Sequence, residues 1–570
     1  MSVGTVMQVG KVYRIEFAYR PKIAEAVKLL PERKFVYADK IWEVPAQHHI
    51  AVREFAKKYD LDFHVETGVE PETNFVIPPL PELTIDIPTK RPMLPWQPNG
   101  VAYAIQKQRV ILGDDMGLGK TSQAVIAMEG LHIQGKAAYP CLVICPSAVK
   151  ENWKKEINAN IHRTGIVLQT SIKSSFMEYY RTGMAQYFIV NFESLKKYFV
   201  TKIDDPGVDE NGRKKPVRLQ HMHFNQKYLD FFKSIIVDES HKVKAATSLN
   251  CKLTKGLSIG KETVFLLTGT PIVNKPKDLV SQLGIMSRMS DFGGYKAFEK
   301  RFCSGPREAS NLKELNYLLN IHCFYRRNKT DPDIKKFLPD KARQVIQCEL
   351  DPVYRREYQH AQADLESYMI NIKKQSEESV KKSLKGEVMV RIGILKNISA
   401  RGKLADAFSF IQDLVDQGQK VVVFASLREV IAKVQERFPR SVRITGAEDG
   451  MQKQAAVDRF KTDPKIDVIV LNLKAGGTGV DGLQNVATQI CFIEFGWHAA
   501  IMDQAEDRLY RTGQHSNVMC TYFLGKNTID EWNYKLINSK REIANTVTGS
   551  EDMTEETLID SVMSLFSKTA

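Results

Sequence analysis

The first part of the chain alternates short strand patterns with short helix patterns. Residues 12–19 place apolar side chains at every second position, which predicts a half-buried strand. Helical spacing follows over residues 23–30, and two apolar runs within residues 35–44 predict a hairpin before a second helix. These patterns predict a small α+β domain of βαββα order over residues 1–66. Six prolines then predict a stiff linker over residues 67–92.

Two longer regions show short apolar runs that alternate with helical stretches. This alternation is typical of a parallel sheet with helices on both faces, so we expect two tandem α/β lobes, over residues 93–285 and 401–535. Residues 286–400 between them are rich in Lys, Glu, Gln, Ser and Leu and are predicted to be helical. An acidic helical tail is expected over residues 536–570. Within the first lobe, polar residues 201–227 predict a surface insertion with the composition of a disordered loop, whose GRKKP stretch fits a solvated loop better than a nuclear signal.

Length, composition and charge indicate what class of protein this is and what kind of partner it binds. At 570 residues the chain is too long for a single small binding module, and 43% hydrophobic with 26% charged residues is typical of globular proteins rather than disordered or collagen-like chains. No apolar run approaches the ~18 residues of a membrane span, so no membrane partner is expected. The net charge of +14 favours a polyanionic partner such as nucleic acid.

The cysteines indicate a reducing compartment. Eight of them are scattered without a Cys-x-x-Cys pair or zinc-type spacing, so we expect reduced and mostly buried thiols. The first residues show neither a charged segment followed by an apolar one nor a cleavage site, so no secretion signal is expected. These observations predict an intracellular, cytoplasmic protein, nuclear if the source is eukaryotic, and the chain length favours a bacterial or viral source.

Residues 113–121, GDDMGLGKT, follow an apolar run and precede a helical one. A glycine-containing loop between a strand and a helix presents backbone N–H groups and the positive end of the helix dipole to phosphate, which predicts an ATP site. In such a loop Gly117 and Gly119 let the backbone wrap the phosphates, and Lys120 reaches the β- and γ-oxygens. The usual pattern has a glycine where this chain has Asp114, so an accidental glycine turn is the alternative. The nucleotide-binding residues predicted here are Asp115, Met116, Gly117, Leu118, Gly119, Lys120, Thr121 and Ser122.

A pair of carboxylates ends another apolar run. In the sequence SIIVDESH, residues 234–241, Asp238 and Glu239 stand where a buried strand would reach the edge of its sheet. Asp238 is predicted to hold Mg²⁺ together with the hydroxyl of Thr121. Glu239 is predicted to orient or deprotonate the water that attacks the γ-phosphate. The alternative is a solvated Asp-Glu loop, which the presence of the phosphate loop disfavours.

Five blocks together resemble the SWI/SNF-related family of helicase superfamily two. They are GDDMGLGKT, DESH, LLTGTP at 266–271, LKAGGTGVDGLQNVA at 473–487 and QAEDRLYRTGQ at 504–514. They span residues 93–520 in the order and spacing of that family. The resemblance implies two RecA-like lobes, hydrolysis of ATP with Mg²⁺, and movement along DNA.

The resemblance also implies roles for residues outside the phosphate loop. Gln97 would read the adenine. Arg508 and Arg511, with Gln504 in the same motif, would reach the nucleotide from the second lobe, where a guanidinium neutralises charge developing at the γ-phosphate. Their spacing predicts one shared helical face, and an exposed pair between Arg508 and Asp507 is the alternative. Expected DNA contacts are Ser147, Lys150, Asn191, Lys474, Gly476, Gly477 and Trp497, and the residues expected to couple lobe closure to DNA are Thr268, Gly269 and Thr270.

Two segments are most similar to the fork-remodelling, strand-annealing branch of that family. One is the motor, through its LTGTP block, FYRRNKTDPDIKKFLP at 324–339 and QAEDRLYRTGQ at 504–514, and the other is the N-terminal unit, which resembles the HARP domain. The second resemblance implies contacts with branched DNA from Arg14, Arg20, Lys22, Lys34 and Lys40. Tyr37 or Trp42 would then stack on bases, although Trp42 fits a core position better.

The function expected from these patterns is ATP-dependent translocation on DNA. A monomeric enzyme would remodel or reanneal strands of duplex, forked or single-strand/duplex junction DNA, in DNA repair or replication-fork maintenance. A conventional strand-separating helicase and the motor of a restriction or repair complex are alternative enzymes. A nucleic-acid clamp without ATPase activity is the non-enzymatic alternative, which the full set of catalytic residues disfavours.

Overall fold

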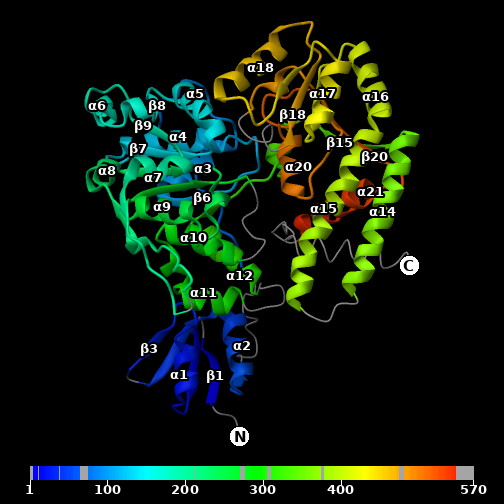
Figure 1. Ribbon diagram of the computed structural model, residues 1–570. Helices are drawn as coiled ribbons and strands as arrows, with labels where there is room; N and C mark the ends of the chain where they lie inside the picture. Colours follow the sequence, from blue (N-terminus) through cyan, green and yellow to red (C-terminus); the bar gives the residue numbers. More distant parts are fainter. Residues whose placement is uncertain are drawn as a thin grey trace.

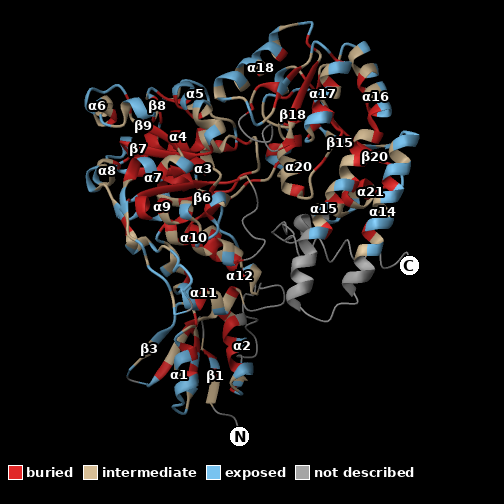
Figure 2. Ribbon diagram, viewed as in Figure 1, coloured by how far each residue is buried: buried red, intermediate tan, exposed pale blue. Residues whose placement is uncertain are grey.

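Apolar runs form three large β-sheets in the computed structural model, which describes residues 4–9, 12–37, 39–64, 75–210, 212–269, 276–303, 310–373, 378–473 and 480–546. Figure 1 shows two lobes side by side, with a small N-terminal domain beneath the first lobe. Buried residues, red in Figure 2, follow the strands of each lobe and of the small domain, so each of the three has its own core. No helix in the described part of the chain combines the length and apolar character needed to cross a membrane.

The N-terminal domain is a five-stranded sheet with two main helices. Its elements are β1 (Gly4–Val9), β2 (Val12–Phe17), α1 (Pro21–Val27), β3 (Lys34–Val36), β4 (Ile41–Pro45), α2 (His49–Lys58) and β5 (Asp62–His64), and the strand order is β3-β4-β2-β1-β5. The predicted hairpin is confirmed, with Phe35 of β3 opposite Trp42 of β4. The predicted βαββα order missed β1 and β5. In β1 an inward position is taken by Gln8, which accepts a hydrogen bond from Tyr13 Oη at 3.2 Å, so a polar residue interrupts the strand pattern.

The first lobe is built on a seven-stranded parallel sheet of order β14-β6-β13-β12-β7-β9-β8. Its strands are β6 (Arg109–Leu112), β7 (Cys141–Cys145), β8 (Gly165–Val167), β9 (Tyr187–Asn191), β12 (Ser234–Val237), β13 (Thr263–Leu267) and β14 (Phe324–Tyr325). Its main helices are α3 (Gln97–Lys107), α4 (Lys120–Ile133), α5 (Lys150–Asn160), α6 (Phe176–Arg181), α7 (Leu195–Phe199), α8 (Gln226–Phe231), α9 (Leu249–Ser258), α10 (Lys277–Ile285), α11 (Tyr295–Phe302) and α12 (Leu312–His322). Every residue of β7, β12 and β13 is buried, as expected for strands covered on both faces.

The insertion of the first lobe contains regular structure where a loop was expected. Strands β10 (Val200–Ile203) and β11 (Met222–Phe224) pair antiparallel at its two ends. Met222 and Phe224 pack against the core of the lobe, which holds this base in place. The exposed residues between the two strands keep the surface position that the sequence predicts.

The second lobe is a six-stranded parallel sheet of order β15-β20-β19-β16-β18-β17. Its strands are β15 (Lys341–Cys348), β16 (Val421–Ala425), β17 (Val442–Ile444), β18 (Val468–Asn472), β19 (Gln489–Phe492) and β20 (Val518–Gly525). Its helices are α14 (Pro352–Lys373), α15 (Glu378–Gly402), α16 (Leu404–Asp416), α17 (Arg428–Arg437), α18 (Gly450–Thr462), α20 (Ala499–Glu506) and α21 (Ile529–Thr546). Both lobes are therefore the parallel α/β units that the sequence predicts.

The segment that joins the lobes is not wholly helical, and the prediction for residues 286–400 is wrong at two strands. Strand β14 adds to the edge of the first sheet beside β6, and β15 adds to the edge of the second sheet beside β20. Between them lies a short helix, α13 (Pro332–Lys335). Strand β14 is only two residues long, and β15 has mostly half-exposed or exposed residues, as edge strands do, so neither shows an apolar run. The crossing segment, which we define as residues 326–340, thus begins and ends in a sheet.

A buried contact between His48 and Glu314 docks the N-terminal domain on the first lobe. His48, at the start of α2, places Nδ1 3.3 Å from Glu314 Oε1 of α12. Glu314 is only 1% exposed and also binds Arg301 of α11 through both carboxylate oxygens. Burial by itself raises the pKa of Glu314, but His48 and Arg301 lower it below its usual range. The small domain is therefore tied to the lobe through a charged carboxylate that water does not reach.

We predict that Glu314→Ala loosens this docking. Removing one member of a buried ionic network leaves the others unpaired, which costs about 3–5 kcal/mol of stability. Urea unfolding should show this loss, and amide exchange should accelerate in α2 and α12. The matched control is Glu25→Ala, which removes an exposed ion pair with Lys28 and should leave both measurements unchanged. Wild-type exchange rates in the Glu314 variant would contradict the assignment.

Candidate nucleotide site between the lobes

The predicted phosphate loop joins β6 to α4, and its shape depends on two glycines. Gly117 and Gly119 have φ of 81° and 82°, in the left-handed region that favours glycine. A Cβ added at Gly119 would collide with the Gln97 amide, and one added at Gly117 would lie 2.5 Å from the Arg511 Cβ. Helix α4 begins at Lys120, so its first N–H groups face the loop. The loop therefore has the backbone geometry that binds phosphate.

The Lys120 ammonium lies within this loop. Its Nζ donates to the backbone carbonyls of Asp114 and Asp115 at 2.6 and 3.2 Å. Burial lowers the pKa of Lys120, while nearby carboxylates, including Glu239, oppose that shift. The ammonium is thus held between the loop and the carboxylates that follow β12, where a γ-phosphate would lie.

Asp114 anchors the loop, which accounts for its presence where the usual pattern has glycine. Its carboxylate is fully buried and accepts hydrogen bonds from Gln123 Nε2 at 2.7 Å and from the Arg327 backbone N–H at 2.9 Å. Burial raises the pKa of Asp114 to about 6. The next residue, Asp115, accepts from Arg326 Nη2 at 3.1 Å and from the Lys329 backbone N–H at 2.9 Å. Two consecutive carboxylates therefore tie the phosphate loop to the crossing segment.

The carboxyl ends of neighbouring parallel strands bring the other predicted residues to the same edge of the sheet. Asp238 follows β12, and its Oδ2 accepts a hydrogen bond from Trp153 Nε1 of α5 at 2.8 Å. Burial and the adjacent charge of Glu239 raise the pKa of Asp238 to about 6. Mg²⁺ prefers oxygen ligands, so the Asp238 carboxylate and the Thr121 hydroxyl have the chemistry of ligands for that ion. The role of Trp153 is not predictable from local sequence patterns, because Trp153 lies 85 positions from Asp238.

Glu239 is held in a strained backbone conformation beside Asp238. Its φ of 50° and ψ of 51° place a non-glycine residue in the left-handed region, which is costly and frequent at functional sites. Its Oε2 lies 3.2 Å from His241 Nδ1. Burial by itself raises the pKa of Glu239, yet the contact with His241 lowers it below the usual range. The charges of Lys120 and Arg508 act in the same direction, so Glu239 is an ionised base.

The two predicted arginines approach this edge from the second lobe. Helix α20 ends at Glu506, so Arg508 and Arg511 lie in the turn after it, and the prediction of one shared helical face is wrong. Burial lowers the pKa of Arg508 to about 10, while the charge of Glu239 opposes the shift across the cleft. Arg511 pairs with Asp481 at 3.1 Å. The alternative pairing of Arg508 with Asp507 is not what the described contacts favour, because Asp507 pairs with a lysine of the crossing segment.

This arginine turn, residues 507–512, touches the phosphate loop directly. Thr512 Oγ1 donates to the Gly117 carbonyl at 2.7 Å. Arg508 Nη1 donates to the Val480 carbonyl at 3.0 Å, within its own lobe. The two lobes therefore meet at the glycine of the loop, with Arg508 in electrostatic reach of Glu239.

Other residues predicted to contact the nucleotide form hydrogen bonds within the protein. Gln97 is buried at the start of α3, where its Oε1 accepts from the Leu94 N–H at 2.9 Å. Ser122 donates to Asn160 Oδ1 at 2.5 Å and is buried, so its side chain serves packing against α5 rather than the nucleotide. The carbonyl of Gln504 accepts a hydrogen bond from Arg508 Nε at 3.3 Å.

The residues predicted to couple the lobes lie after β13, beside the loop. Thr268 donates its backbone N–H to the Leu112 carbonyl at 3.1 Å. A Cβ at Gly269 would lie 2.5 Å from Met116 Cγ and 3.1 Å from Lys120 Nζ, so this backbone packs against the phosphate loop. Thr270 lies outside the described residues.

The predicted DNA contacts are distributed over both lobes. Ser147 and Lys150 follow β7, and Asn191 ends β9, so all three lie at the same sheet edge as the phosphate loop. The ring of Trp497 lies 4.2 Å from Lys396 Nζ and packs in the cluster between α14, α15 and α21, which gives it a structural role. Lys474, Gly476 and Gly477 lie outside the described residues.

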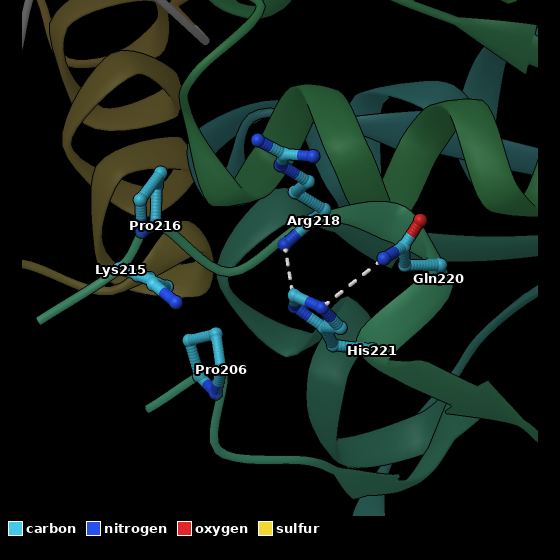
Figure 3. Close-up of a pocket in the computed structure, with 6 residues that line it drawn as sticks. All are labelled: Pro206, Lys215, Pro216, Arg218, Gln220 and His221. Atoms are coloured by element: carbon cyan, nitrogen blue, oxygen red, sulfur yellow. Dashed lines mark hydrogen bonds between the residues drawn. The ribbon is translucent and has the colours of Figure 1, made fainter. Parts of the chain in front are cut away.

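A surface cavity of about 440 Å³ lies elsewhere, in the insertion of the first lobe. Its lining residues are Pro206, Lys215, Pro216, Arg218, Gln220 and His221. Figure 3 shows His221 hydrogen-bonded to Gln220 and to the Arg218 backbone N–H. None of these side chains is a carboxylate or a thiol, so the cavity offers neither a general base of the Glu239 kind nor an oxygen ligand for Mg²⁺.

Comparisons with known proteins show the family to which this chain is similar. The family described as "SNF2-related domain" matches residues 96–401. The chain is 26% identical over 592 residues to the SWI/SNF-related matrix-associated actin-dependent regulator of chromatin subfamily A-like protein 1 homolog of Caenorhabditis elegans, covering 96% of this chain and 76% of the relative. It is 26% identical over 478 residues to the human DNA annealing helicase and endonuclease ZRANB3, covering 81% of this chain and 41% of that relative.

A solved structure with a similar chain is the Sulfolobus solfataricus SWI2/SNF2 ATPase core in complex with dsDNA. The TM-score is 0.39 and the identity 22%, covering 82% of this chain and 96% of that one. The chain spans less than half the length of the human relative and of the two Xenopus relatives that it also matches. These relatives are animal proteins and do not support the expected bacterial or viral source.

We predict that Asp114→Ala destabilises the phosphate loop. The substitution leaves the buried Gln123 amide and the Arg327 N–H without their acceptor, which costs about 1–3 kcal/mol for each unsatisfied group. Urea unfolding should show this loss of stability. Asp114→Asn keeps one acceptor oxygen, so its free energy of unfolding should lie between those of the wild type and Asp114→Ala. Asp413→Ala removes an exposed carboxylate of α16 and serves as the control. Wild-type stability of Asp114→Ala would contradict the anchoring role.

Proposed function

The chain belongs to the SNF2-related family, whose domain covers more than half of its 570 residues, and from this premise we propose that it is a DNA-dependent ATPase that translocates on DNA. The observation that carries the proposal is the meeting of the arginine turn with the phosphate loop. The Thr512 hydroxyl donates to the Gly117 carbonyl, and the negative charge of Glu239 acts to raise the pKa of Arg508. A nucleotide at this seam would be held from both lobes, so binding and hydrolysis would drive their closure and opening.

Each side of the seam has a separate chemical task in this proposal. The N–H groups of the loop and Lys120 bind the phosphates. Glu239 accepts a proton from the attacking water, and Arg508 and Arg511 neutralise the charge that develops on the γ-phosphate. Mg²⁺ held by Thr121 and Asp238 would supply further neutralisation of the phosphate oxygens. The reaction class is therefore hydrolysis of ATP.

We extend the proposal to strand remodelling and reannealing of DNA, at duplex, forked or single-strand/duplex junction sites, in repair or fork maintenance. The name of the human relative describes a DNA annealing helicase, and the net charge of +14 suits a polyanion. The N-terminal domain adds a surface for bases, because Tyr37 is 85% exposed and its ring lies 5.0 Å from that of Phe35. Trp42 is half-buried and packs on Phe35 and the domain core, as a core anchor does.

Two further parts of the proposal concern assembly and location. The seam uses residues of one chain on both sides, so we propose that a monomer is active. Seven of the eight cysteines are buried and Cys303 is half-buried, and none of the eight, all within the described residues, forms a disulfide, which suits a reducing, intracellular environment.

Substitution of the base and of the loop lysine tests the ATPase. Glu239→Gln should keep nucleotide affinity within a few-fold and lower kcat by about 10²–10⁴, because the proton acceptor is lost. Lys120→Ala should instead weaken nucleotide binding itself. Phosphate release with DNA present and titration with a fluorescent ATP analogue measure the two effects. Glu262→Gln, an exposed change on the same lobe, is the control. Rapid hydrolysis by Glu239→Gln would refute the base assignment.

Tyr37→Ala tests the DNA surface of the small domain. We expect forked DNA to bind about 5- to 150-fold more weakly, because base stacking contributes about 1–3 kcal/mol, while thermal unfolding stays unchanged for so exposed a side chain. Fluorescence anisotropy measures affinity, and Met451→Ala, an exposed apolar change on the second lobe, is the control.

The wild-type enzyme tests the choice of DNA activity. We expect single-stranded, blunt duplex and forked DNA to stimulate its ATPase activity, and we expect the same enzyme to anneal strands. Strong unwinding without annealing would indicate a conventional helicase instead.

A further inference from the structure

A lysine of the crossing segment lies at the seam between the phosphate loop and the arginine turn. Lys329 Nζ is 2.7 Å from Asp507 Oδ1 and donates to the Tyr510 carbonyl at 2.5 Å. It also lies 4.6 Å from the centre of the Tyr510 ring. The side chain is 7% exposed. Its partners in the second lobe all belong to the arginine turn.

The backbone of the same residue is fixed to the first lobe. The Lys329 N–H donates to Asp115 Oδ2 at 2.9 Å, so the residue is tied to the phosphate loop. A Cβ at Gly117 would lie 3.8 Å from Lys329 Nζ and 2.5 Å from Arg511 Cβ. One residue therefore contacts the phosphate loop through its backbone and the arginine turn through its ammonium.

Two consecutive carboxylates of the second lobe have different partners. Glu506 is fully buried and binds Lys341, Arg343 and Arg541 of its own lobe at 2.8, 2.6 and 3.1 Å. This cluster fixes the end of α20. Asp507, one residue later, lies 3.9 Å from Lys341 of its own lobe but 2.7 Å from Lys329, so its shortest charged contact crosses the seam.

We propose that Lys329 is a positioning residue that aligns the arginine turn with the phosphate loop, so that Arg508 and Arg511 reach the nucleotide. This inference rests on the proposed function. Lys329 needs no contact with the nucleotide for this role. It sets where the arginines stand when the lobes close.

The energetics suit a contact that forms and breaks. Burying an ammonium is costly, and Asp507 offsets that cost only in part, since burial still lowers the pKa of Lys329 to about 8. The nearby charge of Lys341, whose Nζ lies 4.9 Å from the centre of the Tyr510 ring, also lowers the pKa of Lys329. When the lobes separate, water can solvate the ammonium again. The contact thus favours alignment without locking the lobes together.

The test compares Lys329→Met, which keeps the length and packing, with Lys329→Arg, which keeps the charge. For Lys329→Met we expect kcat with DNA to fall about 10- to 100-fold, because a misplacement of about 1 Å can cost 10²-fold. Nucleotide affinity should stay within a few-fold, since Lys120 and the loop remain. Lys329→Arg should recover part of kcat. Lys335→Met, an exposed change in the same segment, should behave as wild type.

Asp507→Asn provides an independent arm. If Lys329 acts through Asp507, combining Asp507→Asn with Lys329→Met should lower kcat no further than the worse single variant. Small-angle scattering with a non-hydrolysable ATP analogue should show a more open particle for Lys329→Met than for wild type. Equal kcat and equal compaction would overturn the role of Lys329. Absence of ATPase activity in the wild type would overturn the proposed function, while the scattering comparison would still decide on Lys329.

Discussion

The nucleotide site depends on a contact between two lobes, each of which is built on its own sheet. Thr512 of the second lobe donates to the Gly117 carbonyl of the first, at the point where the phosphate loop turns. Only glycine leaves room there, since a side chain would meet Arg511. The loop is therefore shaped as much by the opposite lobe as by its own strand and helix. Phosphate binding and lobe closure are two descriptions of the same geometry.

The buried charged networks of this protein differ in whether they lie within one lobe or join two parts of the molecule. The Glu506 cluster lies inside the second lobe and the Asp114 anchor inside the first, and both fix local shape. The Glu314 network joins the small domain to the first lobe. The Lys329 contact joins the two lobes themselves, beside the seam that must open. The Glu506 and Asp114 networks therefore maintain local shape, whereas the Lys329 contact can affect how the two lobes move relative to each other.

Local features of the sequence were the predictable ones. The phosphate loop and the strands of both lobes occupy contiguous residues, so pattern and function coincide in a short stretch. The arginine turn was mispredicted as helix because α20 ends at Glu506, which spacing alone does not reveal. Partners remote in sequence were not accessible: Ser122 meets Asn160, and Lys329 meets Tyr510, 181 positions away. Edge strands β14 and β15 were not predicted, because neither carries an apolar run of the length that indicates a strand.

The buried pairing of His48 with Glu314 has a mechanical consequence. It holds the small domain on the first lobe, so in the proposed cycle of lobe closure and opening these two parts would move together relative to the second lobe. Any strand gripped by the small domain would then stay stationary in the frame of the phosphate loop. Closure of the second lobe would then act on the nucleic acid against this stationary part.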